Sequence, residues 1–501
     1  MRFISFITIF FLFYHVSQAQ KNNNTDAKLV AAFDAYIKEA LPKWQTPGIS
    51  VAVVKDGKIV SKKAYGLRQL GKPEPFTTAT LSACASTTKA MTAVCMGMLV
   101  DEGKVKWSDK VMDILPAFKL ADPYSSSEIT VLDLFTHNAG LGNADYLWEF
   151  GYSRDEILQR MQLMKPSYSL RSSYIYQNLM YIVAGEVILA VSGKTWDEFL
   201  KEHIFKTLGM NNSFADYSAL RAGMDMASAH FKDKDTVKAI PYLYTDNIGP
   251  AGGVWSCADD MAKWLQCLLD STKIKGGRLL QPATFATLFK PHVIAPETMY
   301  ATMQIIKPHW FTYGLGWFQH DYKGKMIQFH TGSLDGLTAI AGLIPDAHFG
   351  IYIYGNLDHA ELRHALMYKA FDLWAFNDNS QDWSNIFYQH YNAIADTVKM
   401  HENEQLAKRV LNTHPSLPLE NYAGKYVNKR LATIEVTLKE GALILMMPAK
   451  IQLNLQHWNY ETFRGSFSNW WQGHAWVQFL ADKEGKVQAV EVDDVEYDKV
   501  Q

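Results

Sequence analysis

The sequence has no run of basic residues, and its charges almost cancel. Its 501 residues include 49 lysines and arginines against 51 aspartates and glutamates, which gives a formal net charge of −2 at pH 7. Proteins that bind nucleic acid or acidic membrane surfaces do so through clustered positive charge. We therefore expect no nucleic acid among the partners, and we interpret the scattered charges as a solvated surface.

Cysteine is scarce, with only Cys84, Cys95, Cys257 and Cys267 in the chain. Neither a CxxC pair nor an HExxH motif occurs, so no redox pair or zincin-type metal site is indicated, and we expect no metal and no cofactor. An even number of cysteines permits disulfides in an exported protein without requiring them. The apolar helical patterns around Cys95 and Cys267 favour buried thiols.

Long apolar runs are also missing beyond the N-terminus. Residues 1–19 start with a single charge at Arg2, continue as an apolar run and end in Ser-Gln-Ala, the pattern of a cleavable signal peptide. The run is too short for a convincing membrane span, and no second stretch of about 18 apolar residues follows. We expect a periplasmic or secreted chain without a stable membrane span, and the oligomeric state stays open.

About half of the residues are apolar, and the length suffices for one large domain and a smaller one. Two β-rich runs flank Asp56-Gly57, a strong hairpin signal. Helical patterns follow at 81–105, 176–193 and 259–270, the last with Asp259 as a plausible cap. The segments YGLGWFQH, KMIQFHTGS, TAIAGLIP and FGIYIYGN then predict successive strands. This order predicts an α/β fold, in which helices cover an antiparallel sheet built from both ends of the domain.

The pattern changes after residue 375. A polar helical linker is expected over 376–417, and residues 418–501 alternate with period two and turn at Glu440-Gly441 and Glu484-Gly485. We expect a small β-barrel-like accessory domain there, of a size that can fold alone. Its aromatic residues Trp458, Tyr460, Trp470 and Trp471 either form the core of this domain, which we favour, or line a contact surface over an active-site mouth.

Ser86 and Lys89 point to chemistry at the start of the helix over 81–105. Residues three apart share a helix face, so the two side chains are expected to lie one above the other. A serine hydroxyl becomes a good nucleophile only when a base takes its proton. Lys89 can be that base if burial lowers its pKa, or it can support another base electrostatically. An N-terminal helix end also offers free N–H groups to an oxyanion.

Two further motifs have matching chemistry. Tyr176 and Asn178 open the apolar helix over 176–193, and a tyrosine there can act as a base or as a proton shuttle. The amide of Asn178 can hold a lysine and a substrate carbonyl. His330-Thr331-Gly332 ends the strand KMIQFHTGS, where a glycine lets a substrate backbone approach the strand edge.

The motifs S-T-T-K, Y-Q-N and H-T-G in this order resemble those of the serine β-lactamase and penicillin-binding protein superfamily, in its class C-like branch. That branch includes D-alanyl-D-alanine carboxypeptidases, D-aminopeptidases and esterases. The stretches ITVLDLFTHNAGL, PAGGVWSCADDMAKWL and HTGSLDGLTA support the resemblance. It covers residues 26–375 and implies a serine β-lactamase-like hydrolase domain, followed by an accessory domain.

The resemblance also implies roles for single residues. Ser86 resembles the acylated nucleophile, Lys89 the lysine that takes or shares its proton, and Tyr176 the base and the donor to the leaving group. Asn178 resembles the amide that holds the lysine and the substrate. His330, Thr331, Gly332 and Ser333 resemble the substrate-binding strand, with the N–H groups of Ser86 and Ser333 as oxyanion hole. Gly252 and Gly253 resemble a structural glycine pair near the pocket.

One departure bears on the substrate. Dedicated class C β-lactamases usually carry lysine where this chain has His330, and a histidine is only partly charged near neutrality. The resemblance therefore implies an exported serine hydrolase acting on small amides or esters, foremost peptides with D-amino acids, as a carboxypeptidase or an aminopeptidase. A carboxylesterase or weak β-lactamase is one alternative. A non-catalytic penicillin-recognising binding protein is another, because fold alone does not fix function.

Overall fold

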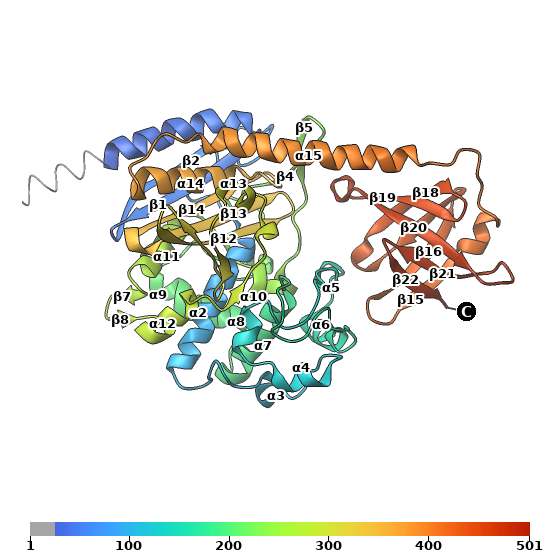
Figure 1. The fold of residues 1–501 in the computed structure, drawn as a ribbon, viewed down its shortest axis with the longest axis horizontal. Helices are drawn as coiled ribbons and strands as arrows, with labels where there is room; N and C mark the ends of the chain where they lie inside the picture. Colours follow the sequence, from blue (N-terminus) through green and yellow to red (C-terminus); the bar gives the residue numbers. More distant parts are fainter. Residues whose placement is uncertain (1–25, 501) are drawn as a thin grey trace, which may run out of the picture.

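The computed structural model describes residues 26–500, in which a helix-covered sheet and a β-barrel are joined by one long helix (Figure 1). The signal peptide expected over 1–19 lies outside the described residues. The chain enters through a helix over 26–43. The connecting helix, α15 (Trp383–Ala407), begins against the sheet domain and runs out to the barrel.

An eight-stranded antiparallel sheet forms the centre of the first domain. Its strands, in spatial order, are β2 (Lys58–Gly66), β1 (Gly48–Lys55), β14 (Phe349–Gly355), β13 (Leu337–Ile344), β12 (Lys325–Leu334), β11 (Phe318–Tyr322), β10 (Phe311–Tyr313) and β9 (Val293–Ile294). The sheet thus joins strands from both ends of the domain, which confirms the predicted α/β architecture. The segment YGLGWFQH, expected as one strand, is split between β10 and β11 because Gly316 adopts a positive φ of 84° between them.

The β1–β2 hairpin shows how local sequence sets the sheet edge. Asp56 and Gly57 both have positive φ, 50° and 71°, as a two-residue type I′ turn requires. Successive side chains of β1 point to opposite faces of the sheet. Val51 and Val53 therefore belong to the apolar cluster that includes α14 (Leu362–Ala375), α15 and the helix over 26–43. Ala52 and Val54 face the opposite cluster, which contains α2 (Thr88–Asp101) and α11 (Ala258–Leu269).

Helices and short hairpins on this second side build the surroundings of the site. α11 begins at Ala258 with Cys257 as N-cap, so the expected cap Asp259 is wrong; its carboxylate instead binds Thr78 and Lys62. The remaining helices are α3 (Val111–Ile114), α4 (Pro123–Glu128), α5 (Tyr146–Glu149), α6 (Arg154–Met161), α7 (Leu179–Ser192), α8 (Trp196–Leu200), α9 (Lys206–Leu208), α10 (Gly249–Gly252), α12 (Pro282–Phe289) and α13 (Met303–Ile306). The two-stranded sheets are β3 (Ser82–Ala83) with β6 (Trp255–Ser256), β4 (Ala229–Asp233) with β5 (Thr236–Ile240), and β7 (Lys273–Ile274) with β8 (Gly277–Arg278).

The C-terminal part is a closed antiparallel barrel. Its strands are β15 (Gly424–Asn428), β16 (Ala432–Lys439), β17 (Ala442–Met446), β18 (Gln452–Asn459), β19 (Thr462–Phe467), β20 (His474–Ala481), β21 (Val487–Val492) and β22 (Val495–Lys499). Side chains such as Tyr426, Leu445 and Phe479 fill the interior. The expectation that Trp458, Tyr460, Trp470 and Trp471 form this core is wrong: none of them belongs to it, and Tyr460 is 61% exposed.

All four cysteines are buried free thiols, so the disulfides that the sequence permitted do not form. Within residues 26–500, no single helix is long and apolar enough to cross a membrane. The pair formed by α7 and the helical segment Trp196–Leu208, bent by 76°, meets both criteria only when taken together.

Candidate active site

The segment before α2 holds Ser86 in a short 3-10 turn, η1 (Ala85–Thr87), at the N-terminal end of the helix. Ala85 has a φ of 47°, a left-handed conformation that costs free energy in a residue with a Cβ and is common at functional sites. The conformation is braced on one side by Thr87, whose hydroxyl donates to the Cys84 carbonyl at 2.8 Å. On the other side β12 packs so closely that a Cβ on Gly332 would lie 2.1 Å from the Cys84 carbonyl oxygen. Gly332 is therefore required by the packing against the nucleophile segment.

Lys89 lies beside Ser86 and is fully buried. Its Nζ lies 3.2 Å from Ser86 Oγ, 2.6 Å from Asn178 Oδ1 and 2.9 Å from the Ala251 carbonyl oxygen. Burial lowers the pKa of Lys89 to about 7, although the nearby Asp145 opposes the shift. The Asn178 and Ala251 oxygens can only accept hydrogen bonds. When Lys89 is neutral, its two N–H groups satisfy them, and its lone pair is left for the Ser86 hydroxyl.

Asn178 is oriented by Asp145, a residue that the sequence analysis missed. Asn178 is the N-cap residue of α7, and its Nδ2 donates to Asp145 Oδ1 at 2.9 Å. A carboxylate only accepts hydrogen bonds, so this contact fixes the amide with its oxygen toward Lys89. Asp145 is itself the N-cap residue of α5. The only sequence signal was its place shortly after the family-like stretch ITVLDLFTHNAGL.

Tyr176 lies against Lys89, whose Nζ is 4.8 Å from the centre of the tyrosine ring. Its hydroxyl oxygen is buried and has no hydrogen-bond partner of standard geometry among the described residues. Burial raises the pKa of Tyr176 well above its usual value, and the proximity of Ser86 only partly opposes this. Tyr176 is therefore held as a neutral phenol, which can donate a proton.

His137 also contacts the Tyr176 ring, with ring centres 4.3 Å apart, and it too was missed as a site residue. Its Nδ1 accepts a hydrogen bond from the Gln177 N–H at 3.0 Å, so Nε2 carries the proton. That Nε2 is buried without a hydrogen-bond partner in the described part of the chain. Burial, with Lys89 and His330 nearby, lowers the pKa of His137 well below its usual value. His137 is thus a neutral imidazole between the tyrosines of the site.

His330 is saturated by protein groups. Its Nδ1 donates to the Thr331 carbonyl at 2.6 Å, and its Nε2 accepts from the Tyr313 hydroxyl at 3.0 Å. Burial and Lys89 lower the pKa of His330 to about 3. The expectation of a partly charged histidine near neutrality is therefore wrong: His330 is neutral and buried. The hydroxyl groups of Thr331 and Tyr300 are hydrogen-bonded at 2.8 Å. Ser333, two residues further along β12, is exposed.

The end of β12 is held from behind by Arg363, another residue without a sequence signal. Its Nη1 donates to the Gly332 carbonyl at 2.5 Å and to Ser333 Oγ at 2.9 Å. Arg363 is buried and is paired with Glu361 at 3.0 Å. Arg363 and His364 lower the pKa of Glu361 far below its usual value despite its burial. This pair therefore holds Gly332 and Ser333 at the end of β12, next to the Ser86 segment.

The remaining expected residues have packing roles. Gly252 ends α10, and Gly253 approaches Gly249 so closely that a Cβ would lie 2.7 Å from the Gly249 Cα. Between Gly249 and Gly253 the chain presents the Ala251 carbonyl to Lys89. The structure thus brings Ser86, Lys89, Tyr176 and Asn178 together beside the 330–333 end of β12.

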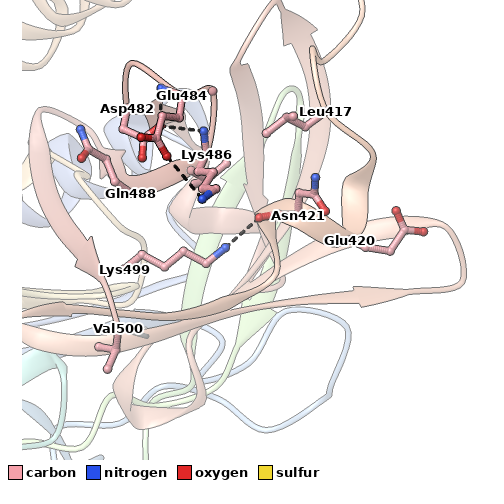
Figure 2. Close-up of a pocket in the computed structure, with 11 residues that line it drawn as sticks. Leu417, Glu420, Asn421, Asp482, Glu484, Lys486, Gln488, Lys499 and Val500 are labelled. Atoms are coloured by element: carbon pink, nitrogen blue, oxygen red, sulfur yellow. Dashed lines mark hydrogen bonds and ion pairs between the residues drawn. The ribbon is translucent and has the colours of Figure 1, made fainter.

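A separate surface groove lies on the barrel and contains none of these residues. Figure 2 shows it, lined by Leu417, Asn421, Lys486 and Lys499 among others. Lys486 pairs with Glu484 at 3.4 Å, and Lys499 donates to the Asn421 carbonyl at 2.7 Å. The groove residues include no nucleophile paired with a base.

A partly exposed serine in contact with a buried lysine, beside the strand of a helix-covered antiparallel sheet, defines a serine hydrolase that works by nucleophilic catalysis. The model of the family described as Beta-lactamase matches residues 33–372, and the chain belongs to this family. A second model, described as Domain of unknown function (DUF3471), matches residues 408–501.

Known relatives agree with this assignment. The chain is 28% identical over 425 residues to the Unguisins hydrolase ungD' of Aspergillus campestris (strain IBT 28561), covering 81% of this chain and 77% of the relative. The octameric penicillin-binding protein homologue from Pyrococcus abyssi has the same fold, with a TM-score of 0.61 at 21% identity over 93% of this chain and 99% of that one. SurE solved with D-Leu is similar at a TM-score of 0.54 and 17% identity, over 95% and 100%.

Proposed function

We propose that this serine hydrolase is exported and forms an acyl-enzyme on Ser86 with small amide or ester substrates, foremost peptides that contain D-amino acids. The observation that carries the proposal is the contact between Ser86 Oγ and a Lys89 amine whose pKa is about 7. At neutral pH a large share of Lys89 is then unprotonated, and its lone pair faces the serine proton.

In the proposed mechanism, the Ser86 proton moves to Lys89 Nζ as Oγ attacks the substrate carbonyl carbon. The N–H groups of Ser86 and Ser333 stabilise the oxyanion. When the tetrahedral intermediate collapses, the leaving group takes the Tyr176 proton, and protonated Lys89 returns a proton to the phenolate. Water then attacks the acyl-enzyme by the same route. Burial disfavours a standing Tyr176 anion, which supports Lys89 over Tyr176 as the base.

The charges around the site support substrates that need no cation for their recognition. His330 is neutral, Lys89 is enclosed, and Arg363 is committed to Glu361 and to the backbone. A free substrate carboxylate would therefore meet no available positive side chain among these three residues. This favours aminopeptidase-like or ester cleavage over carboxypeptidase action. The D-Leu in the SurE structure supports D-amino acids as the residue class.

Labelling and turnover test the proposal. A fluorophosphonate or a fluorescent penicillin should modify Ser86, and Ser86→Ala should abolish the label; labelling that survives this change contradicts the assignment. A panel of aminoacyl-D-amides, acyl esters and a chromogenic cephalosporin then separates aminopeptidase, esterase and weak β-lactamase. Stoichiometric labelling without turnover of any of them would favour a penicillin-recognising binding protein.

Export is proposed from residues 1–19 alone. Expression of the full chain in a Gram-negative host, followed by fractionation and N-terminal sequencing, should yield a protein outside the cytoplasm that begins at Gln20. A full-length chain retained in the cytoplasm would contradict this part.

A further inference from the structure

Two tryptophans of the barrel, Trp470, which is exposed, and Trp471, which is partly buried, contact the first domain beside the end of β12. They lie in the turn η10 (Trp470–Gln472) between β19 and β20. Trp471 Nε1 donates to Asp335 Oδ2 at 2.9 Å, and Asp335 lies two residues beyond Ser333. The Trp470 ring meets the edge of Phe231 on β4 at 5.8 Å and 87°, with Lys238 Nζ 5.3 Å from the Trp470 ring centre.

The barrel also contacts the opposite side of the site, where Asn178 is held. Tyr146 and Phe150, at the two ends of α5, pack against the barrel core. The Tyr152 hydroxyl donates to the Leu431 carbonyl at 2.9 Å, and Arg160 donates to the same carbonyl at 2.9 Å. α5 starts immediately after Asp145, so this contact borders the residue that orients Asn178.

The two contact regions adjoin two segments that carry site residues, the end of β12 and the segment of Asp145. Glu149 on α5 has its pKa raised to about 7, first by burial and then by the charges of Asp145 and Asp335. Asp145 binds Asn178, and Asp335 directly follows the last residue of β12. Carboxylates from both segments therefore lie within electrostatic range of Glu149 on α5.

We infer that the barrel turn Trp470–Gln472 forms a wall of the active-site mouth, which restricts the hydrolase to small substrates and excludes polymers. The inference rests on the proposed function, because it takes Ser86 as the reacting residue. Trp471 acts through Asp335 and is a specificity-determining residue that takes no part in bond cleavage. The Trp471 indole closes the side of the mouth that faces the barrel. Through Asp335 it also fixes the turn that follows β12.

Labelling of the full-length protein by two probes tests this wall without a known substrate. One probe is a small alkyl fluorophosphonate, and the other carries a bulky dye close to the phosphorus. The wild type should react much faster with the small probe. Trp471→Ala should raise the relative rate of the bulky probe by about tenfold or more, the scale of steric discrimination in enzyme pockets.

A matched control comes from another tryptophan of the same barrel, whose aromatic contact lies within the barrel. Trp476 is 38% exposed and contacts Trp458, so Trp476→Ala should leave the ratio of the two rates unchanged. If Trp471→Ala does not fold, as judged by thermal melting, Trp471→Phe keeps an aromatic ring but removes the N–H donor and part of the indole, and it should still raise the relative bulky-probe rate.

The outcomes separate the two proposals. Failure of both probes to label Ser86 would overturn the proposed function and the wall with it. Fast labelling of the wild type by both probes, or an unchanged ratio in a folded Trp471 variant, would overturn the wall alone and leave Ser86 as the nucleophile.

Discussion

At the scale of single residues, the site is built around the Lys89 amine, whose pKa is lowered by burial so that it is partly uncharged near neutral pH. Lys89 is fully buried and contacts oxygen atoms of Ser86, Asn178 and Ala251, with no carboxylate in direct contact. Most buried lysines are paired with an acid, which would hold the charge in place. Here the groups in direct contact are neutral and Asp145 acts only from a distance, so burial lowers the pKa of Lys89 to about 7.

The first prediction concerns the base. Lys89→Arg should lower acylation of Ser86 by orders of magnitude, because a guanidinium does not deprotonate in this range. In the wild type, the acylation rate should rise with pH and reach half of its plateau near pH 7. Stopped-flow labelling across pH 5–9 measures both. A well-folded Lys89→Arg protein with near-normal acylation would instead make Tyr176 the base.

Lys89 should also make stability depend on pH. Its pKa is about 10.4 in an unfolded chain and about 7 in the fold, so between these values the unfolded state binds more protons and stability rises with pH. The slope for one proton is about 1.4 kcal/mol per pH unit. Lys89→Met should flatten the rise of the unfolding free energy between pH 7 and 10, measured by denaturant titration. Equal slopes in both proteins would contradict the buried, neutral amine.

Tyr176 should matter most for poor leaving groups. An amine must be protonated as it departs, whereas an activated phenolate ester needs no such help. Tyr176→Phe should therefore slow amide cleavage by about 10²-fold or more, and it should leave p-nitrophenyl ester cleavage within a few-fold of wild type. Steady-state rates on a matched amide and ester decide this, and equal losses would remove Tyr176 as the proton donor.

At the scale of elements, β12 and the nucleophile segment form a single unit. Because Gly332 has no side chain, β12 can pack directly against the Cys84 carbonyl. Arg363 holds the same strand end by donating hydrogen bonds to the Gly332 carbonyl and to Ser333 Oγ. The packing of one strand end against one helix start thus sets the position of Ser333 relative to Ser86, the two residues whose N–H groups we propose as the oxyanion hole.

The Arg363–Glu361 pair supports this unit and can be tested as such. Arg363→Met should destabilise the protein by about 3–5 kcal/mol, because it leaves the buried Glu361 carboxylate without its permanently charged partner and with His364 alone. Adding Glu361→Gln should restore part of the melting temperature, while the rate of Ser86 labelling stays low because the β12 end has lost its brace. Full recovery of labelling in the double variant would reduce Arg363 to a purely structural residue.

At the scale of the whole molecule, the sequence predicted what local patterns encode. Asp56-Gly57 determines a hairpin by its own backbone preferences, and the spacing of Ser86 and Lys89 places them on one face. Asp145 and Arg363 escaped prediction because each reaches the site from a distant segment with no motif of its own. The barrel tryptophans were misplaced for a related reason, since alternation shows that a strand is half-buried but does not show what covers its connecting turns.

The position of β1 in the sheet has a consequence in time. Val51 on β1 pairs with Ile353 on β14. During synthesis, β1 can therefore pair with β14 only after about 300 further residues have been made. At about 5–20 residues per second, this interval is roughly 15–60 seconds on the ribosome. Throughout it, the apolar strand GISVAVV has an unpaired edge of the kind that nucleates aggregation. The yield of the protein in expression should therefore depend more on chaperones that bind the unfolded chain than on the stability of the folded state.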